Sequence, residues 1–134
     1  MTDKKTILIV EDEQAMLTAL SLKLQKKFNV LTAEDGEIGV AVAMEKHPDL
    51  IIMDIMMPKL NGMDAVSKIR EDAEWGFDVP IIMLTNLNDP LLVADAARFK
   101  VYDFLVKTDW NLSEIVDFVQ DRINKIPEPL EDDE

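Results

Sequence analysis

The chain has 134 residues, no cysteine, and a net charge of −13 from 27 acidic and 14 basic side chains. The missing cysteines exclude disulfides and thiolate metal sites, and the negative charge argues against direct nucleic-acid binding, which requires cations against the phosphates. No apolar run approaches the roughly 20 residues that span a bilayer, and no signal peptide precedes the first apolar run. We therefore expect one cytoplasmic domain over residues 1–126, with no membrane contact, followed by a solvated acidic tail over 127–134.

Apolar runs typical of buried strands alternate with stretches of helical spacing along the chain. Pro48 and Pro127 end two of the helical stretches, since the residue before a proline disfavours helix, and Asn88 or Asp89 precedes Pro90 as a helix cap. In chain order the pattern predicts a strand at 7–10, a helix at 14–27, a strand at 30–33, a helix at 37–46, a strand at 50–53, a helix at 63–72, a strand at 79–84, a helix at 90–99, a strand at 101–106 and a helix at 112–126. Five consecutive strand–helix units predict an α/β fold, a doubly wound parallel sheet between two helical layers.

Polar side chains stand where four of these predicted strands end. Glu11 and Asp12 follow the first strand, Asp54 follows the third, Thr85 follows the fourth and Lys107 follows the fifth. Parallel strands bring their carboxyl ends to one edge of the sheet, where ligands of such sheets bind. Three crowded carboxylates repel, so at least one would be protonated unless a cation neutralised them, and oxygen ligands in a small cluster suit Mg²⁺.

The same set of groups suits a phosphoryl group arriving at Asp54. An ionised carboxylate can attack as a nucleophile and form an aspartyl-phosphate without a separate general base. Lys107 would supply fixed positive charge and Thr85 a hydroxyl donor, which is the charge stabilisation that phosphoryl transfer depends on.

Four short motifs carry a resemblance over almost the whole chain. They are Val-Glu-Asp at 10–12, Met-Asp-Ile-Met-Met-Pro at 53–58 with Gly62, Met-Leu-Thr at 83–85 and Phe-Leu-Val-Lys at 104–107. In combination they resemble the receiver domain of two-component response regulators, in a CheY-like, stand-alone form. The resemblance implies a flavodoxin-like fold with strand order 2-1-3-4-5.

The resemblance also implies a role for each residue of the set. Asp54 corresponds to the phospho-acceptor, which receives its phosphoryl group from a histidine kinase or a phosphotransfer protein. Asp12 corresponds to a direct Mg²⁺ ligand, Glu11 to a ligand through water, and the backbone carbonyl of Met56 to a further ligand. Thr85 and Phe104 occupy the positions of the family's switch pair, in which the hydroxyl moves toward the phosphate and the ring turns inward.

Two consequences for signalling follow from the resemblance. The surface built by the last two helices and the strand between them, roughly Pro90 to Ile126, is expected to bind a protein target, and it also offers a route to a homodimer. The protein would then be a switch and not an enzyme, beyond catalysing its own phosphotransfer and a slow dephosphorylation.

Several positions depart from the family pattern. Thr108 stands where the family usually has proline after a cis peptide bond, so the loop after the fifth strand is expected to differ in shape. Asn86 replaces a small residue beside the site, and Lys100-Val101 replaces a common Gly-Ala. Met56 and Leu87 are apolar and neither can orient a hydrolytic water, which predicts a long-lived phosphate.

Two other functions stay open at this point. A Mg²⁺-dependent phosphohydrolase with an Asp nucleophile usually has a second Asp two residues further on, where this chain has Met56. An interaction module that no longer accepts phosphate is disfavoured by the complete acidic set and Lys107. His47 is expected at the surface at a helix end, while Trp75 and Trp110 are expected in loops, either contacting a partner or packing over a helix end.

Overall fold

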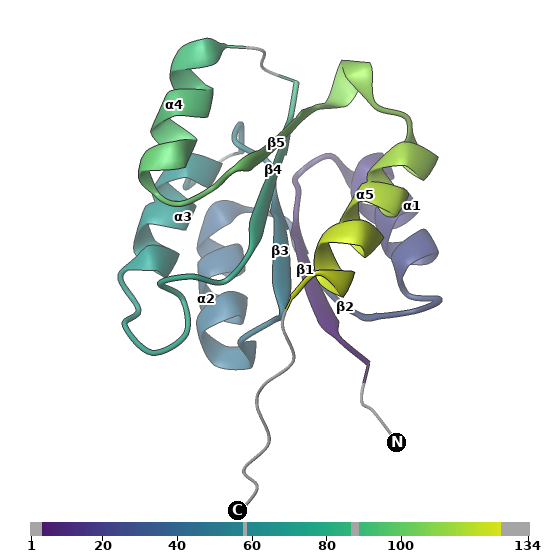
Figure 1. Ribbon diagram of the computed structural model, residues 1–134, viewed down its shortest axis with the longest axis horizontal. Helices are drawn as coiled ribbons and strands as arrows, with labels where there is room; N and C mark the ends of the chain where they lie inside the picture. The colour runs from purple at the N-terminus through teal and green to yellow at the C-terminus, as the bar shows by residue number, and fades with distance from the viewer. Residues whose placement is uncertain (1–3, 58, 87–88, 127–134) are drawn as a thin grey trace, which may run out of the picture.

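A computed structural model of the protein describes residues 4–57, 59–86 and 89–126. Five parallel strands form one sheet in the order β2-β1-β3-β4-β5 (Figure 1). The strands are β1 Thr6–Val10, β2 Asn29–Ala33, β3 Leu50–Met53, β4 Ile81–Thr85 and β5 Asp103–Val106. The helices are α1 Gln14–Leu24, α2 Gly36–Lys46, α3 Gly62–Arg70, α4 Pro90–Arg98 and α5 Leu112–Asn124, with a short 3₁₀ turn η1 at Lys107–Asp109.

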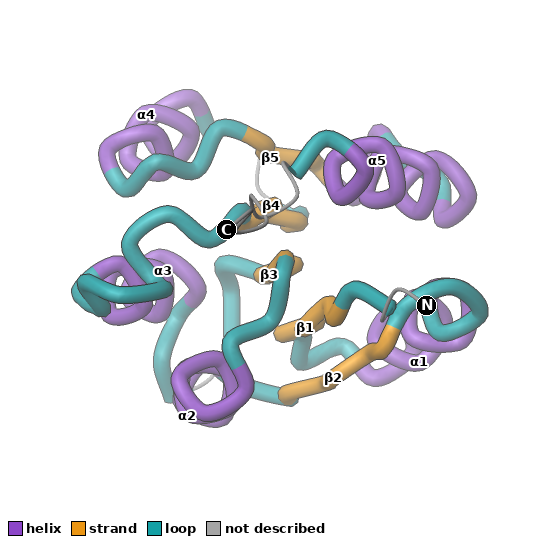
Figure 2. Tube along the Cα trace, turned by 60° about the horizontal axis from the view of Figure 1, so that its bottom comes forward, coloured by secondary structure: helices purple, strands orange, loops and turns teal. Residues whose placement is uncertain are grey.

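The helices cover both faces of the sheet. Figure 2 shows α1 and α5 on one side, and α2, α3 and α4 on the other. Successive residues of a strand point to opposite faces, so Ile52 packs into the core under α1 and α5 while Met53 packs into the core under the other three helices. All four residues of β3 are buried for this reason. The predicted doubly wound, flavodoxin-like fold with order 2-1-3-4-5 is confirmed.

The predicted element boundaries are less accurate than the predicted elements. Val79 and Val101 were expected to open β4 and β5, but both lie outside the strands although they are buried. Their side chains fill the core beside the sheet, and their apolar character alone made them resemble strand residues in the sequence. The first and last helices also end earlier than expected, at Leu24 and Asn124 instead of residues 27 and 126.

Side chains cap the starts of α4 and α5, and the α4 cap is one that the sequence predicts. Asp89, one of the two predicted caps, accepts a hydrogen bond from the Leu91 amide at 2.9 Å, while Asn88 lies outside the described residues. Asn111 and Glu114 form a reciprocal capping box at the start of α5. Such caps satisfy amides that the first helical turn leaves without partners.

Arg70, the last residue of α3, joins three segments. Its guanidinium donates to the carbonyl oxygens of Phe99 at 2.7 Å, Gly76 at 2.9 Å and Lys100 at 3.2 Å. Phe99 and Lys100 directly follow α4, and Gly76 lies between α3 and β4. The ends of α3 and α4 are therefore held together through one charged group.

In the described part of the chain, none of the helices has the length and apolar character required to cross a membrane. Trp75 lies in the segment between α3 and β4, as expected, and Trp110 packs edge-on against Phe118 of α5 with ring centroids 5.4 Å apart. Residues 127–134, predicted to be an acidic tail, lie outside the described residues.

Candidate functional site

Three carboxylates meet at the carboxyl edge of the sheet. Glu11 directly follows β1, Asp12 is next to it, and Asp54 directly follows β3. The Asp54 amide still donates to the Val10 carbonyl at 3.0 Å, which continues the ladder between β1 and β3 and fixes where both side chains start. One oxygen from each carboxylate lies within 4.8 Å of the others, with Glu11 and Asp54 buried and Asp12 exposed.

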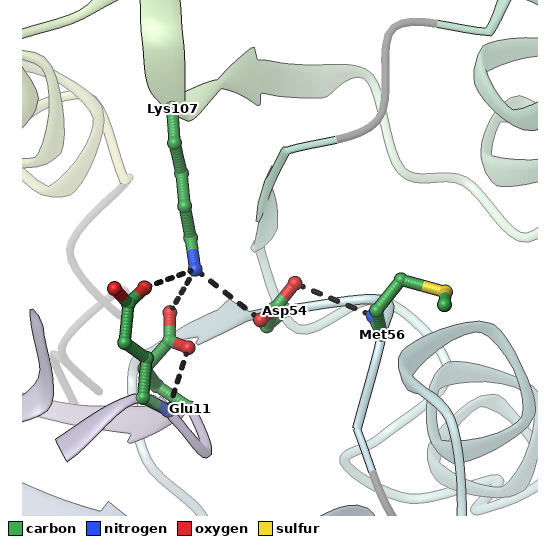
Figure 3. A network of polar contacts seen from close by, with 5 residues as sticks. Glu11, Asp54, Met56 and Lys107 are labelled. Carbon is green, nitrogen blue, oxygen red and sulfur yellow. Dashed lines mark hydrogen bonds and ion pairs between the residues drawn. The ribbon is translucent and has the colours of Figure 1, made fainter.

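Lys107 brings a positive charge into this cluster from the end of β5. Its Nζ lies 2.8 Å from Glu11 Oε1 and 3.3 Å from Asp54 Oδ2, and its side chain is only 6% exposed. Figure 3 shows the Lys107 side chain extending from the backbone just after β5 to the two carboxylates. Burial lowers the pKa of Lys107, but the hydrogen bonds and charges of Glu11 and Asp54 outweigh burial and raise that pKa above its ordinary value. The ammonium group therefore stays charged at neutral pH.

The protonation of Glu11 depends on its surroundings. Burial, reinforced by the charge of Asp54, raises its pKa to about 7, although the hydrogen bond from Lys107 acts in the opposite direction. The Glu13 amide also donates to Glu11 Oε2 at 3.1 Å and fixes the orientation of the carboxylate. A second cation in the cluster would favour the ionised form of Glu11.

The loop that follows Asp54 folds back over it. The Met56 amide donates to Asp54 Oδ1 at 3.3 Å, and the Gly62 amide donates to the Ile55 carbonyl at 2.8 Å. A Cβ atom at Gly62 would lie 2.0 Å from the Asp54 carbonyl oxygen, so only glycine permits this close approach. The Asn61 side chain then caps α3 by accepting from the Asp64 amide at 2.9 Å.

Thr85 and Phe104 lie on the neighbouring strands at the same edge. Thr85 is the last residue of β4, is fully buried and pairs with Val106 of β5, while Phe104 pairs with Met83. Because residues two apart share a face of a sheet, the Thr85 and Phe104 side chains point to the face covered by α2, α3 and α4. Phe104 is half-buried there against the core.

The structure thus brings Glu11, Asp12, Asp54 and Lys107 together as the strand pattern predicts, and places Thr85 at the same edge. It adds Glu13, which the sequence reasoning did not single out: its Oε1 lies 3.4 Å from Lys107 Nζ. Its position directly after the acidic pair was the available signal. The carboxylate is 58% exposed and stands at the mouth of the site.

The departures from the family pattern have visible outcomes. The Lys107–Thr108 peptide bond is trans, since no cis bond occurs among the described residues, and the backbone continues there as the 3₁₀ turn η1. Asn86 and Met56 are exposed beside the site, Met56 to 61%. Leu87, predicted to flank the phosphate, lies outside the described residues.

The donor set fits a hard divalent cation. Three carboxylates on two adjacent strand ends offer closely spaced oxygen ligands, and one of the three is open to solvent. Mg²⁺ and similar ions are usually held by one or two carboxylates while they keep several waters. The acidic cluster is therefore suitable for a divalent metal ion.

Comparison with known proteins agrees with this geometry. The family model "Response regulator receiver domain" matches residues 7–120. The chain is 36% identical over 106 residues to a probable transcriptional regulator, ycf27, of Cyanophora paradoxa, covering 78% of this chain and 43% of that protein. It is also 36% identical over 103 residues to the transcriptional regulatory protein AfsQ1 of Streptomyces coelicolor, covering 76% and 44%.

The chain thus spans less than half the length of these two relatives. Among solved structures, the chemotaxis response regulator CheY4 of Vibrio cholerae is 29% identical with a TM-score of 0.79, covering 90% of this chain and 98% of that one. With the family model matched over most of its length and the acidic cluster at the expected edge of the sheet, this chain belongs to the response regulator receiver domains, the phospho-acceptor modules of two-component signalling.

Proposed function

We propose that the protein is a phosphorylation-controlled switch in which Asp54 accepts the phosphoryl group. Receiver domains are partners of histidine kinases, and a histidine kinase or a phosphotransfer protein in the cytoplasm would be the donor. The single observation that carries the proposal is the position of Asp54: a buried carboxylate with one oxygen 3.3 Å from Lys107 Nζ and the other 3.3 Å from the Met56 amide. These two contacts hold the carboxylate in place.

The transfer requires little beyond positioning and charge. One oxygen of the Asp54 carboxylate attacks the phosphorus of the donor's phosphohistidine, the P–N bond breaks, and the imidazole leaves with the bonding pair and takes up a proton. Lys107 is close enough to compensate negative charge on the phosphoryl oxygens, and the Thr85 hydroxyl is proposed as a further donor to them. Nothing has to remove a proton from Asp54, because its reactive form is the ionised carboxylate.

Mg²⁺ is the proposed cofactor. Glu11, Asp12, Asp54 and the backbone carbonyl of Met56 would hold it, and it would supply charge neutralisation for the phosphoryl oxygens. The described carboxylates support this assignment because Glu11, Asp12 and Asp54 lie close together, while Lys107 pairs with Glu11 and Asp54, so a further cation would balance the cluster.

Thr85 and Phe104 are the proposed route from the site to the surface. Their side chains share the face covered by α4, and the Phe104 ring is only half-buried against the core. Phosphorylation would shift the population between two arrangements of this region. The surface of α4, β5 and α5 would change its fit to a target protein, or to a second copy of this chain.

Intact-mass measurement after incubation with Mg²⁺ and acetyl phosphate tests the proposal. The wild-type protein should gain one acid-labile phosphoryl group, and Asp54→Asn should gain none. Asp35→Asn is a matched control, since Asp35 is also buried and its asparagine can still cap α2. Continuous donor turnover would instead indicate a phosphohydrolase, and an unmodified wild-type protein would indicate a phosphorylation-independent interaction module.

The lifetime of the phosphate is a second proposal about the same site. Met56 is 61% exposed beside Asp54 and carries no group that could orient a hydrolytic water. We expect slow self-dephosphorylation and faster phosphate loss in Met56→Asn, which adds a polar side chain at the mouth. Phosphate release from the purified, phosphorylated protein measures both rates; loss within seconds from the wild type would contradict the proposal.

A further inference from the structure

Lys107 has a third carboxylate partner, which differs from the other two in its exposure to solvent. Its Nζ lies 3.4 Å from Glu13 Oε1, and the Glu13 side chain is 58% exposed, whereas the side chains of Glu11 and Asp54 are 2% and 6% exposed. Of the three carboxylates on this lysine, Glu13 is therefore the one that a phosphodonor arriving from solvent meets first.

The fold makes no use of the Glu13 side chain in capping the helix that begins there. Glu13 occupies the N-cap position of α1, where a side chain often accepts from an amide of the first turn, but its carboxylate makes no such bond. The Glu13 backbone is nevertheless fixed, because its amide donates to Glu11 Oε2 at 3.1 Å and its carbonyl accepts from the Leu17 amide at 3.0 Å. The carboxylate thus has a fixed base, and an exposed ion pair such as its contact with Lys107 contributes little to stability.

The charge of Glu13 acts on the same ammonium group that the reaction uses. In the proposed transfer, Lys107 compensates negative charge on the phosphoryl oxygens. Glu13 offsets part of that positive charge and adds a negative charge beside the incoming donor. At a separation of about 4 Å in water, one pair of unit charges changes a rate about fivefold. The effect therefore grows with the negative charge of the donor.

We propose that Glu13 selects phosphodonors by charge. It slows transfer from small, highly anionic phosphate compounds and penalises less a donor whose leaving group carries a positive charge. A phosphohistidine with a protonated imidazole is of the second kind, and so is a donor protein with a cationic side chain opposite Glu13. This inference rests on the proposed phospho-acceptor function of Asp54, and it makes Glu13 a specificity-determining residue that limits phosphorylation by small metabolites.

Two small donors differ in the property that matters. Acetyl phosphate is a dianion near neutral pH, whereas phosphoramidate has a lower net charge because its nitrogen is protonated. In both reactions an oxygen of Asp54 attacks phosphorus. The P–O bond of acetyl phosphate breaks and acetate leaves, or the P–N bond of phosphoramidate breaks and ammonia leaves with the bonding pair. Intact-mass measurement in the presence of Mg²⁺, at several donor concentrations, gives the rate for each.

Glu13→Gln keeps the size of the side chain and removes its charge. We expect faster labelling by acetyl phosphate and a smaller gain with phosphoramidate, so that the ratio of the two rates rises about threefold to fivefold. This rise should shrink at high salt, which screens exposed charges. Glu13→Asp retains the charge and should keep the wild-type ratio. Glu45→Gln is the matched control, since it removes one exposed carboxylate near the end of α2 that leads to the start of β3, at the opposite edge of the sheet.

The outcomes separate this inference from the function on which it rests. Equal changes for both donors in Glu13→Gln, or no change for either, would overturn it, because Glu13 would then act through packing or not at all. An equal rise of the ratio in Glu45→Gln would overturn it too, since the net charge of the protein would then be responsible. A wild-type protein that neither donor labels would instead refute the phospho-acceptor role of Asp54, and this inference with it.

Discussion

Replacing Lys107 by methionine tests whether this lysine neutralises the acidic cluster. Methionine keeps most of the apolar stem of Lys107 and removes the charge that lies 2.8 Å from Glu11 and 3.3 Å from Asp54. Removing one partner of a buried ion pair typically costs about 3–5 kcal/mol. That value is an upper bound here, because Glu11, whose pKa is already about 7, can take up a proton instead.

The loss of stability should therefore depend on pH. Without Lys107 the pKa of Glu11 rises further, so above pH 7 the folded variant binds more protons than the folded wild type. Its stability then falls relative to the wild type as pH rises, by up to about 1.4 kcal/mol per pH unit for each extra proton. We expect a difference of about 1 kcal/mol at pH 6, where Glu11 is protonated in both proteins, and a larger one at pH 9.

Urea denaturation followed by circular dichroism measures both values. Adding Mg²⁺ at pH 9 should narrow the difference, because a bound cation replaces the missing charge. Arg98→Met is the control: Arg98 makes an exposed pair with Asp95 at 3.6 Å, which contributes less than about 1 kcal/mol at either pH. A Lys107→Met difference that is equal at both pH values and unaffected by Mg²⁺ would show that Lys107 acts through packing and not through charge.

Three further predictions concern separate parts of the molecule. Gly62→Ala should lower the melting temperature, because its Cβ would lie 2.0 Å from the Asp54 carbonyl oxygen; an unchanged temperature would contradict the described loop. Mg²⁺ affinity, measured by calorimetric titration, should fall as pH drops below about 7, since the ion must then displace the Glu11 proton, and a constant affinity would exclude Glu11 as a ligand. Arg70→Lys should reduce the free energy of unfolding in urea by about 2 kcal/mol, since lysine cannot reach all three carbonyls, whereas Arg98→Lys should change it little.

The sheet could be predicted because its central strands are buried on both faces. The side chains of residues Leu50 to Met53 pack alternately into the cores on the two faces of the sheet. All four are therefore apolar, which is typical of parallel strands. The convergence of Glu11, Asp54 and Lys107 followed from topology alone, since each stands directly after a parallel strand. These predictions needed no knowledge of side-chain packing.

Other features depend on contacts between distant segments. Glu13 and Lys107 are 94 positions apart, and Arg70 is 29 positions from Phe99, so neither contact leaves a local pattern. Val79 and Val101 are buried and apolar, but backbone pairing decides whether such residues belong to a strand. For the same reason the sequence left open whether Trp75 packs over a helix end or contacts a partner. Its stack on His47 depends on the segments before β3 and before β4 lying together, which no local pattern shows.

The Arg70 contacts also determine how α4 could move. Because the carbonyls that follow α4 are bound to the end of α3, a displacement arising at Thr85 would reach α4 at its opposite end, and the helix would rotate about Arg70. A nine-residue helix is about 13 Å long, so a rotation of about 10° would displace its first turn by roughly 2 Å. That turn carries Leu91, which is 74% exposed. The largest movement would thus occur at an apolar side chain already accessible to a partner, while the base of the helix stays in place.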